Sequence, residues 1–243
     1  MFRFITTAYN CEKYIANTIK SIKAQNNTFK SVIVDDSSTD NTLKVINDTV
    51  GDDDRFVVVS NQDNKKQLHN IVQAINLHGS IADDDIIVWV DGDDWLPNNK
   101  VLEILERTYT QYKCLCTYSN FVSTRGEIGW GSEYPQTIKV TNRYREWKWS
   151  ATHLRTFKYK LWKNLNIDDL RDESGEYYIA SGDFAVFIPL LEMSGVRNFF
   201  IDEILYVYNT HNPLNVHKLK KGCQLKIEQE IRSKKKYDKV DFD

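Results

Sequence analysis

The sequence lacks several features that mark whole classes of protein. Its 243 residues contain four cysteines, whose spacing does not match that of zinc ligands, and we expect Cys114 and Cys116, in an apolar strand-like segment, to be reduced thiols. No apolar run approaches the roughly 18 residues that a membrane span requires. The start has no basic stretch followed by an apolar one. We therefore expect no secretion signal, no transmembrane segment and a cytoplasmic location.

The sequence also has no large excess of positive or negative charge. The formal net charge is −2, so overall electrostatics predict no nucleic-acid partner. Hydrophobic residues make up 41% of the chain, which is enough for a sizeable core. Charged residues make up 27%, which is near the average for globular proteins. Length and composition together predict one α/β domain with an elaborated second half.

The most informative stretch runs from Ile86 to Trp95. Five apolar residues form a buried-strand pattern that ends in Asp91, Gly92, Asp93 and Asp94. Crowded carboxylates repel one another unless a cation lies among them. Such oxygen ligands favour Mg²⁺ or Mn²⁺ bound together with substrate phosphates, and open α/β sheets bind ligands beyond the carboxyl ends of their strands. The alternative interpretation is a polar turn, because Asp and Gly are ordinary turn residues.

A second strand pattern ends in carboxylates at residues 32–42. The apolar run stops at Asp35 and Asp36, and Asp40 follows where helix capping is an equally simple role. Upstream, Phe2 to Thr6 predict a first strand, with a turn at residues 7–10 and then an amphipathic helix. Strand, turn, helix, strand, acidic turn and helix indicate a doubly wound fold.

Three segments, in order, resemble family 2 glycosyltransferases of the GT-A fold. They are Ala8-Tyr9-Asn10, the acidic turn at residues 34–42, and Asp91-Gly92-Asp93-Asp94. The resemblance implies an α/β fold of GT-A type, with a Rossmann-like, mostly parallel sheet flanked by helices. It also implies a metal-dependent glycosyltransferase that moves a sugar from a nucleotide-sugar donor, with UDP expected, to a carbohydrate or glycoconjugate acceptor with inversion.

The resemblance also implies a division of the chain. A catalytic domain would cover residues 1–215, with a nucleotide-sugar half at 1–112 and an acceptor half at 113–215. Residues 216–243 form a Lys-rich tail, for which we expect a solvated, partly helical segment. A peripheral contact of this tail with an anionic membrane surface is the alternative.

Family resemblance assigns the nucleoside contacts. By this resemblance Thr7, Ala8 and Tyr9 would lie against the base or ribose. Asp36 would accept a hydrogen bond from the uracil ring N–H.

The same resemblance assigns the ribose and metal contacts. Asp91 and Gly92 would lie near the ribose, and Asp93 would bind Mn²⁺ or Mg²⁺. His69 and Asn70 would face the nucleotide, although His69 stands where the family more usually has arginine. A surface histidine on a helix is the alternative for His69.

The acceptor half supplies a candidate base. Inverting transfer needs a group that takes the proton of the acceptor hydroxyl, and Asp183 in Gly182-Asp183 matches the family's acidic residue before a helix. A pure N-cap role is the alternative. Pro189 indicates that the helix begins nearer Phe187, because proline beyond the first turn disrupts a helix.

Other residues are weaker candidates for the site. Residues 153–157 resemble a family segment between the donor and acceptor regions, by which Arg155 would meet phosphate, with a surface ion pair as the alternative. His211 follows the last apolar strand and would complete the metal or diphosphate site, with a surface loop as the alternative. Residues 123–150 are predicted as loops over the site. The three tryptophans of this stretch would either stack on an acceptor sugar or fill the core: Trp130, Trp147 and Trp149.

The same motifs can be compared with those of three alternative functions. A metal-dependent phosphatase of the haloacid-dehalogenase type expects Thr or Val two residues after the second Asp, and Trp95 stands there instead. A nucleotidyltransferase expects a Gly-rich loop after the first strand, and residues 7–11 contain no glycine. A non-catalytic sugar- or nucleotide-binding module stays open.

Overall fold

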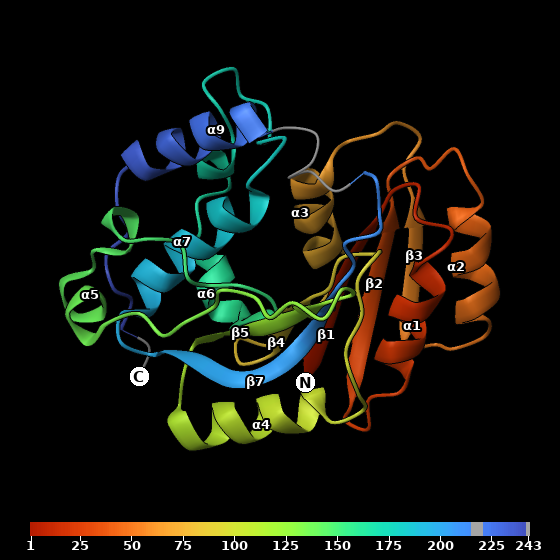
Figure 1. Cartoon of the computed structure of the whole chain (residues 1–243), viewed down its shortest axis with the longest axis horizontal. Coiled ribbons are helices and arrows are strands. Elements are labelled where there is room, and N and C mark those ends of the chain that lie inside the picture. Colours follow the sequence, from red (N-terminus) through yellow and green to blue (C-terminus); the bar gives the residue numbers. More distant parts are fainter. Residues whose placement is uncertain (215–220, 242–243) are drawn as a thin grey trace.

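The computed structural model describes residues 1–214 and 221–241, and the chain forms a sheet covered by helices on both faces (Figure 1). In the described ranges the sheet has seven strands, joined in the order β3-β2-β1-β4-β6-β5-β7. The strands are β1 (Phe2–Ala8), β2 (Phe29–Asp35), β3 (Phe56–Ser60), β4 (Ile86–Trp89), β5 (Cys116–Ser123), β6 (Arg155–Lys158) and β7 (Asn198–Tyr208).

Helices fill the connections between these strands. Those of the first half are α1 (Ile15–Lys23), α2 (Thr42–Val50), α3 (Gln67–Leu77) and α4 (Val101–Tyr112). Those of the second half are α5 (Gln136–Thr141), the 3₁₀ turns η1 (Tyr144–Glu146) and η2 (Ile167–Leu170), α6 (Tyr159–Lys163), α7 (Gly182–Ser194) and α9 (Lys221–Ser233). None of the helices in the described ranges combines the length and the apolar content needed to cross a bilayer.

Strand direction decides which ends meet. β1, β2, β3 and β4 are parallel, β6 is antiparallel to both β4 and β5, and β5 is parallel to β7. The carboxyl ends of six strands therefore lie at one edge of the sheet, together with the amino end of β6. In parallel α/β sheets this edge is where ligands bind.

Two apolar cores lie on opposite faces of the sheet, and they follow the alternation of strand side chains. Ile5, Ile87 and Trp89 face one core, which α3, α6, α7 and α9 cover. Phe4 and Val88, from the same two strands, face the other core, which α1, α2 and α4 cover. The predicted α/β layers are confirmed.

The structure departs from the sequence-based expectations in three places. β1 continues to Ala8, so Thr7 and Ala8 end a strand instead of forming a turn. α7 begins at Gly182 and contains Pro189, so its predicted start near Phe187 is wrong. Residues 123–150 are not only loops, since α5 and η1 lie within them.

The Lys-rich segment also differs from the expected solvated tail. Ile227 and Ile231 of α9 are buried in the core on α7, because they place one apolar stripe on that helix. Residues 215–220 and 242–243 of this segment lie outside the described residues.

Candidate active site

The acidic segment after β4 is pressed against the end of β1. The backbone N–H of Gly92 donates to Thr7 O at 3.0 Å, and a Cβ atom at Gly92 would stand 2.7 Å from that same oxygen. Only glycine allows this approach. Thr18 Oγ1 donates to Asp94 O at 2.6 Å and so ties the segment to α1 as well.

Hydrogen bonds orient Asp91 from three directions. Its Oδ1 atom accepts from Trp89 Nε1 at 2.9 Å and from Gln67 Nε2 at 2.8 Å. Its backbone N–H donates to the Tyr206 hydroxyl at 3.1 Å. The acidic segment is therefore held by the ends of both β4 and β7 and by the start of α3.

Four carboxylates form what we call the carboxylate cluster: Asp91, Asp93, Asp94 and Asp183. Burial, and then the charge of Asp93, raise the pKa of Asp91 to about 6. Burial and the charges of Asp93 and Asp91 raise the pKa of Asp94 well above its usual range. Burial raises the pKa of Tyr208, and all four members of the cluster raise it further. The arrangement gathers more negative charge than a buried site favours.

A divalent cation fits this donor set, because oxygen ligands of like charge lose their mutual repulsion when such a cation lies among them. Within residues 1–214 and 221–241, however, no three His, Cys, Asp or Glu side chains are arranged as a ready metal site. Asp93 Oδ2 instead accepts from Asn212 Nδ2 at 2.7 Å. His211 is exposed, and its Nδ1 lies 3.0 Å from Thr124 Oγ1.

Asp36 anchors the loop that leads into α3. Its Oδ1 accepts from Lys65 N at 2.7 Å and Asn61 Nδ2 at 3.0 Å, and its Oδ2 accepts from Lys66 N at 2.9 Å. Asn61 Nδ2 also reaches Asn70 Oδ1 at 2.8 Å. The predicted nucleoside residues Asp36 and Asn70 are thus brought into one buried polar network. A carboxylate offers about four acceptor positions, and these bonds use three of them.

The remaining predicted nucleoside residues lie at the same edge. Ala8 is buried, Thr7 is half-buried, and Tyr9 is 42% exposed just beyond β1. His69 is packed edge-on against Tyr177, with ring centroids 5.5 Å apart. Asp40 has the capping role that was its alternative, because its Oδ1 accepts from Thr42 N, the first residue of α2, at 2.9 Å.

Asp183 forms an ion pair with Arg155, and both residues lie in the second half of the chain. Arg155 Nη2 lies 2.5 Å from Asp183 Oδ2, and the side chains are 6% and 32% exposed. Every residue of α7 except Asp183 is buried, so this carboxylate is the only group that the helix offers to the site. The N-cap of α7 is Ser181, so the expected N-cap position of Asp183 is wrong and the carboxylate lies in the first turn instead.

The three candidate tryptophans have different environments. Trp149 packs edge-on against Phe184, with centroids 4.9 Å apart, and Trp147 packs partly buried against the same core. Trp147 and Trp149 therefore pack against the core, which was the alternative to stacking on an acceptor sugar. Trp130 is 66% exposed.

Several contributors to the site were not predicted from the sequence. Gln67, Tyr206 and Asn212 hold Asp91 and Asp93, whereas the segment that contains Tyr206 and Asn212 was singled out for His211 alone. Arg155 was identified, although its partner is a carboxylate of this chain. The sheet order places β6 beside β4, and an isolated bridge between Trp95 and Val207 joins the end of β7 to the acidic segment.

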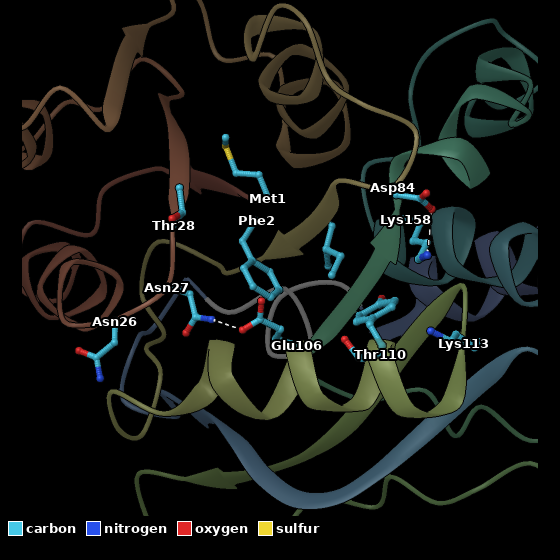
Figure 2. A pocket seen from close by; sticks show the side chains of 12 residues that line it. Met1, Phe2, Asn26, Asn27, Thr28, Asp84, Glu106, Thr110, Lys113 and Lys158 are labelled. Atoms are coloured by element: carbon cyan, nitrogen blue, oxygen red, sulfur yellow. Dashed lines mark hydrogen bonds and ion pairs between the residues drawn. The ribbon is translucent and has the colours of Figure 1, made fainter.

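A cavity of about 780 Å³ lies at the opposite edge of the sheet. Figure 2 shows it between the first residues of β1 and the helix α4, with Met1, Phe2, Thr28 and Glu106 on its walls. The strands begin at this edge, and none of the carboxylate cluster lines the cavity. The predicted chemistry lies at the edge where the strands end.

Comparison with known proteins identifies relatives of this chain. The model of glycosyl transferase family 2 matches residues 4–170. A chondroitin synthase of Pasteurella multocida (strain Pm70) is 29% identical over 206 residues, which are 82% of this chain and 19% of the synthase. The chain thus spans about a fifth of the length of that relative.

Solved structures share the fold. TarS of S. aureus in complex with UDP-GlcNAc has a TM-score of 0.64 and 18% identity, over 87% of this chain and 59% of that one. The mannosyltransferase PcManGT of Pyrobaculum calidifontis, in complex with GDP-Man and Mn²⁺, has a TM-score of 0.62 and 15% identity, over 97% and 65%. Identity at this level shows the fold alone, which is that of GT-A glycosyltransferases.

Proposed function

Because the chain belongs to glycosyl transferase family 2, we propose that it transfers a sugar from a UDP-sugar to a hydroxyl of a carbohydrate or glycoconjugate, with inversion. The observation that carries this proposal is the carboxylate cluster, in which the acidic segment after β4 meets Asp183 and its partner Arg155. The GT-A fold excludes the haloacid-dehalogenase phosphatase as an alternative.

The donor would lie over the ends of β1, β2 and β4. Asp93 is the proposed ligand for Mn²⁺ or Mg²⁺, which would supply charge neutralisation for the departing diphosphate. Thr7, Ala8, Tyr9, Asp91 and Gly92 would border the nucleoside. The complex of PcManGT with GDP-Man and Mn²⁺ supports divalent-metal use in this fold, and that of TarS with UDP-GlcNAc supports a UDP-sugar.

Buried polar residues would line the base from the side of α3. Asp36 would offer its last acceptor position on Oδ2 to the uracil N–H. Asn70 has a buried Nδ2 without a hydrogen-bond partner, and His69 has a buried Nδ1 in the same state, among the residues that the structure describes. Both atoms support a polar ligand beside α3, because buried polar groups are normally paired.

Asp183 is the proposed base. Arg155 binds its Oδ2 and so fixes the carboxylate, which leaves Oδ1 to accept the proton of the acceptor hydroxyl. A base of this kind acts from the face of the sugar opposite the leaving diphosphate, and inversion follows from that placement. The ion pair also explains why Arg155 is not available to bind phosphate in this arrangement.

The first experiment is a screen of UDP- and GDP-sugars for nucleotide release with Mn²⁺ present. We expect one UDP-sugar to be turned over and Asp93→Asn to abolish turnover nearly completely, with the fold retained, because the change removes only a charge. A protein that binds UDP but releases nothing from any donor or acceptor tested would be the non-catalytic module. Near-normal activity of Asp93→Asn would remove Asp93 as the metal ligand.

The second experiment concerns the residues beside Asp93. His211 stays our proposed further ligand, while Asn212 is the residue that contacts Asp93. If His211 is a ligand, His211→Ala weakens Mn²⁺ and UDP binding together, and Asn212→Ala, which removes a competitor for Asp93 Oδ2, does not weaken Mn²⁺ binding. An unchanged Mn²⁺ titration in His211→Ala would show that His211 is a surface-loop residue and not a metal ligand.

Location and membrane contact stay predictions. Among the described residues the cysteines form no disulfide, and reduced thiols stay a prediction. We keep a cytoplasmic location as part of the proposal, and likewise a peripheral contact of residues 216–243 with an anionic membrane surface.

A further inference from the structure

Trp130 is exposed in a way that the fold does not require. It is 66% exposed, the most of any large apolar side chain in the described ranges, and Ile128 beside it is 61% exposed. Tryptophan is normally buried over most of its surface, because no other side chain removes as much apolar area from water. Trp130 and Ile128 together expose apolar surface, and a binding role is inferred from that pair and from the contacts of Trp130.

Two glycines hold the backbone on either side of Trp130 against β5. A Cβ atom at Gly129 would lie 2.5 Å from the ring of Phe121, and one at Gly131 would lie 2.3 Å from Thr152 Oγ1. Gly129 N donates to Phe121 O at 2.9 Å, and Gly131 N donates to Asn120 Oδ1 at 3.1 Å. The indole is thus presented by a backbone that is fixed before and after it.

A chain of ring contacts connects Trp130 to the acidic segment. Its ring meets Phe121 edge-on, with centroids 5.6 Å apart, and Phe121 lies 5.9 Å from the ring of His153. His153 lies 4.7 Å from Tyr206, whose hydroxyl accepts from Asp91 N. Since β5 and β7 end at the same edge as β4, Trp130 lies on the rim of the proposed active site.

We propose that Trp130 is the platform on which a pyranose ring of a carbohydrate acceptor stacks, and that it thereby determines acceptor specificity. This inference rests on the proposed function and names its substrate class. The C–H face of a pyranose is apolar and slightly positive, and it matches the negative face of an indole ring. Exposed Arg125 and Glu127 in the same loop supply polar partners for the hydroxyl groups at the ring edge.

The test uses three variants of the full chain. Trp130→Ala removes the platform, Trp130→Phe keeps a smaller one, and Ile128→Ala removes a neighbouring exposed apolar side chain without touching an aromatic face. Because both positions are exposed, we expect all three variants to melt at the wild-type temperature. The probes are the methyl β-glycosides of glucose, galactose and N-acetylglucosamine, and a hyaluronan tetrasaccharide.

Two readouts separate this proposal from the proposed function. Nucleotide release from a UDP-sugar without acceptor tests the enzyme, and we expect it to be equal in all variants. The second readout is binding of each probe, followed by the NMR signal of the Trp130 indole N–H and by the acceptor KM. We expect Trp130→Ala to weaken probe binding about tenfold or more, Trp130→Phe to weaken it less, and Ile128→Ala to leave it unchanged.

Three outcomes would overturn the platform. They are a Trp130 indole signal that no probe shifts at the highest soluble concentration, equal probe binding by Trp130→Ala and wild type, or an equal loss in Ile128→Ala. Absent nucleotide release in the wild type with every donor and acceptor tested would overturn the proposed function instead, and the NMR titration would still decide whether Trp130 binds sugar.

Discussion

At the residue scale, Asp183 combines exposure with a fixed orientation. Its ion pair with Arg155 holds one carboxylate oxygen, while the rest of α7 is buried around it. We expect Asp183→Asn to lower kcat by roughly 10²–10⁴-fold, the usual contribution of a general base, with UDP affinity little changed. Turnover assays and UDP titrations would measure the two effects separately, and NMR of the product should show the inverted anomer.

The matched control for Asp183 is Asp168→Asn, at an exposed carboxylate of η2 that pairs with Arg171. It should leave both constants unchanged. A loss of UDP affinity as large as the loss of kcat in Asp183→Asn would show that the start of α7 collapses. A retained anomer would remove Asp183 from the role of base.

Lys66 carries backbone strain beside the nucleoside network. Its φ of 72° and ψ of 162° lie in a region that only glycine enters easily, and the bond from its N–H to Asp36 helps to hold it there. We expect Lys66→Gly to be more stable than Lys66→Ala by about 1 kcal/mol or more, since both lose the side chain and only glycine loses the strain. Urea denaturation of the two variants measures the difference. Equal midpoints would show that residue 66 is unstrained in solution.

Residue identity was enough to predict the acidic segment but not its supports. The apolar run of β4 and the carboxylates behind it are adjacent in the chain, so their meeting needs no knowledge of the fold. The bonds from Asn212 to Asp93 and from Gln67 to Asp91 join residues far apart in sequence. Their common residue types gave no hint of a partner, because such contacts follow from strand order alone.

At the scale of elements, α7 and the C-terminal segment are joined by a buried ion pair. Arg145 of η1 binds Glu192 of α7 through two bonds, at 2.6 and 2.9 Å, and both side chains are at most 3% exposed. Arg145 Nη1 also donates to Ile231 O of α9, and Tyr237 N donates to Glu192 Oε2 at 3.1 Å. One carboxylate thus fixes three segments.

We expect Glu192→Gln to destabilise the fold by about 3–5 kcal/mol, because it leaves the Arg145 guanidinium buried without its counter-charge. Asp48→Asn is the control, since it breaks the pair with Lys44, whose side chains are 72% and 63% exposed, and should cost at most about 0.5 kcal/mol. Urea unfolding measures both. Equal effects of the two changes would contradict a structural role for the Glu192 pair.

The periodicity of α7 was predicted correctly and its start was not. Pro189 lacks the N–H that would bond to Ala185 O, which costs about 3 kcal/mol in an isolated helix. In α7 all the other residues except Asp183 are buried, and this packing outweighs one missing bond. For α9 the apolar spacing of Ile227 and Ile231 was visible, but the surface that buries it is on α7, which no local pattern reveals.

At the scale of the whole molecule, ionisable groups of the two sheet edges respond to acid in opposite ways. At the edge of the active site, the pKa of Asp91 is raised to about 6, so protonation of this group as pH falls towards 4 favours the folded, metal-free protein. Elsewhere, Arg55 lowers the pKa of Asp53 to about 2, and Lys158 and Lys160 do the same for Asp84. These two pairs lose their stabilisation only between about pH 4 and pH 2.

His78, at the end of α3, titrates in the same pH window as Asp91 but changes stability in the opposite direction. Its Nε2 lies 2.9 Å from Phe4 O, and burial lowers its pKa to about 4, against about 6.5 in an unfolded chain. Between these two values the unfolded state binds more protons than the folded state. The contribution of neutral His78 is therefore complete above about pH 6.5 and is lost as pH falls to about 4.

We expect this loss to be about 2 kcal/mol after a discount for the partial exposure of the ring. His78→Gln, which stays uncharged throughout, should make the protein less sensitive to pH in this window only. The measurement is the difference in unfolding free energy between wild type and His78→Gln from pH 7 to pH 3. Because Asp91, Asp53 and Asp84 titrate alike in both proteins, their contributions cancel in this difference. A difference that stays constant from pH 7 to pH 4 would show that His78 is as easily protonated in the folded protein as in the unfolded chain.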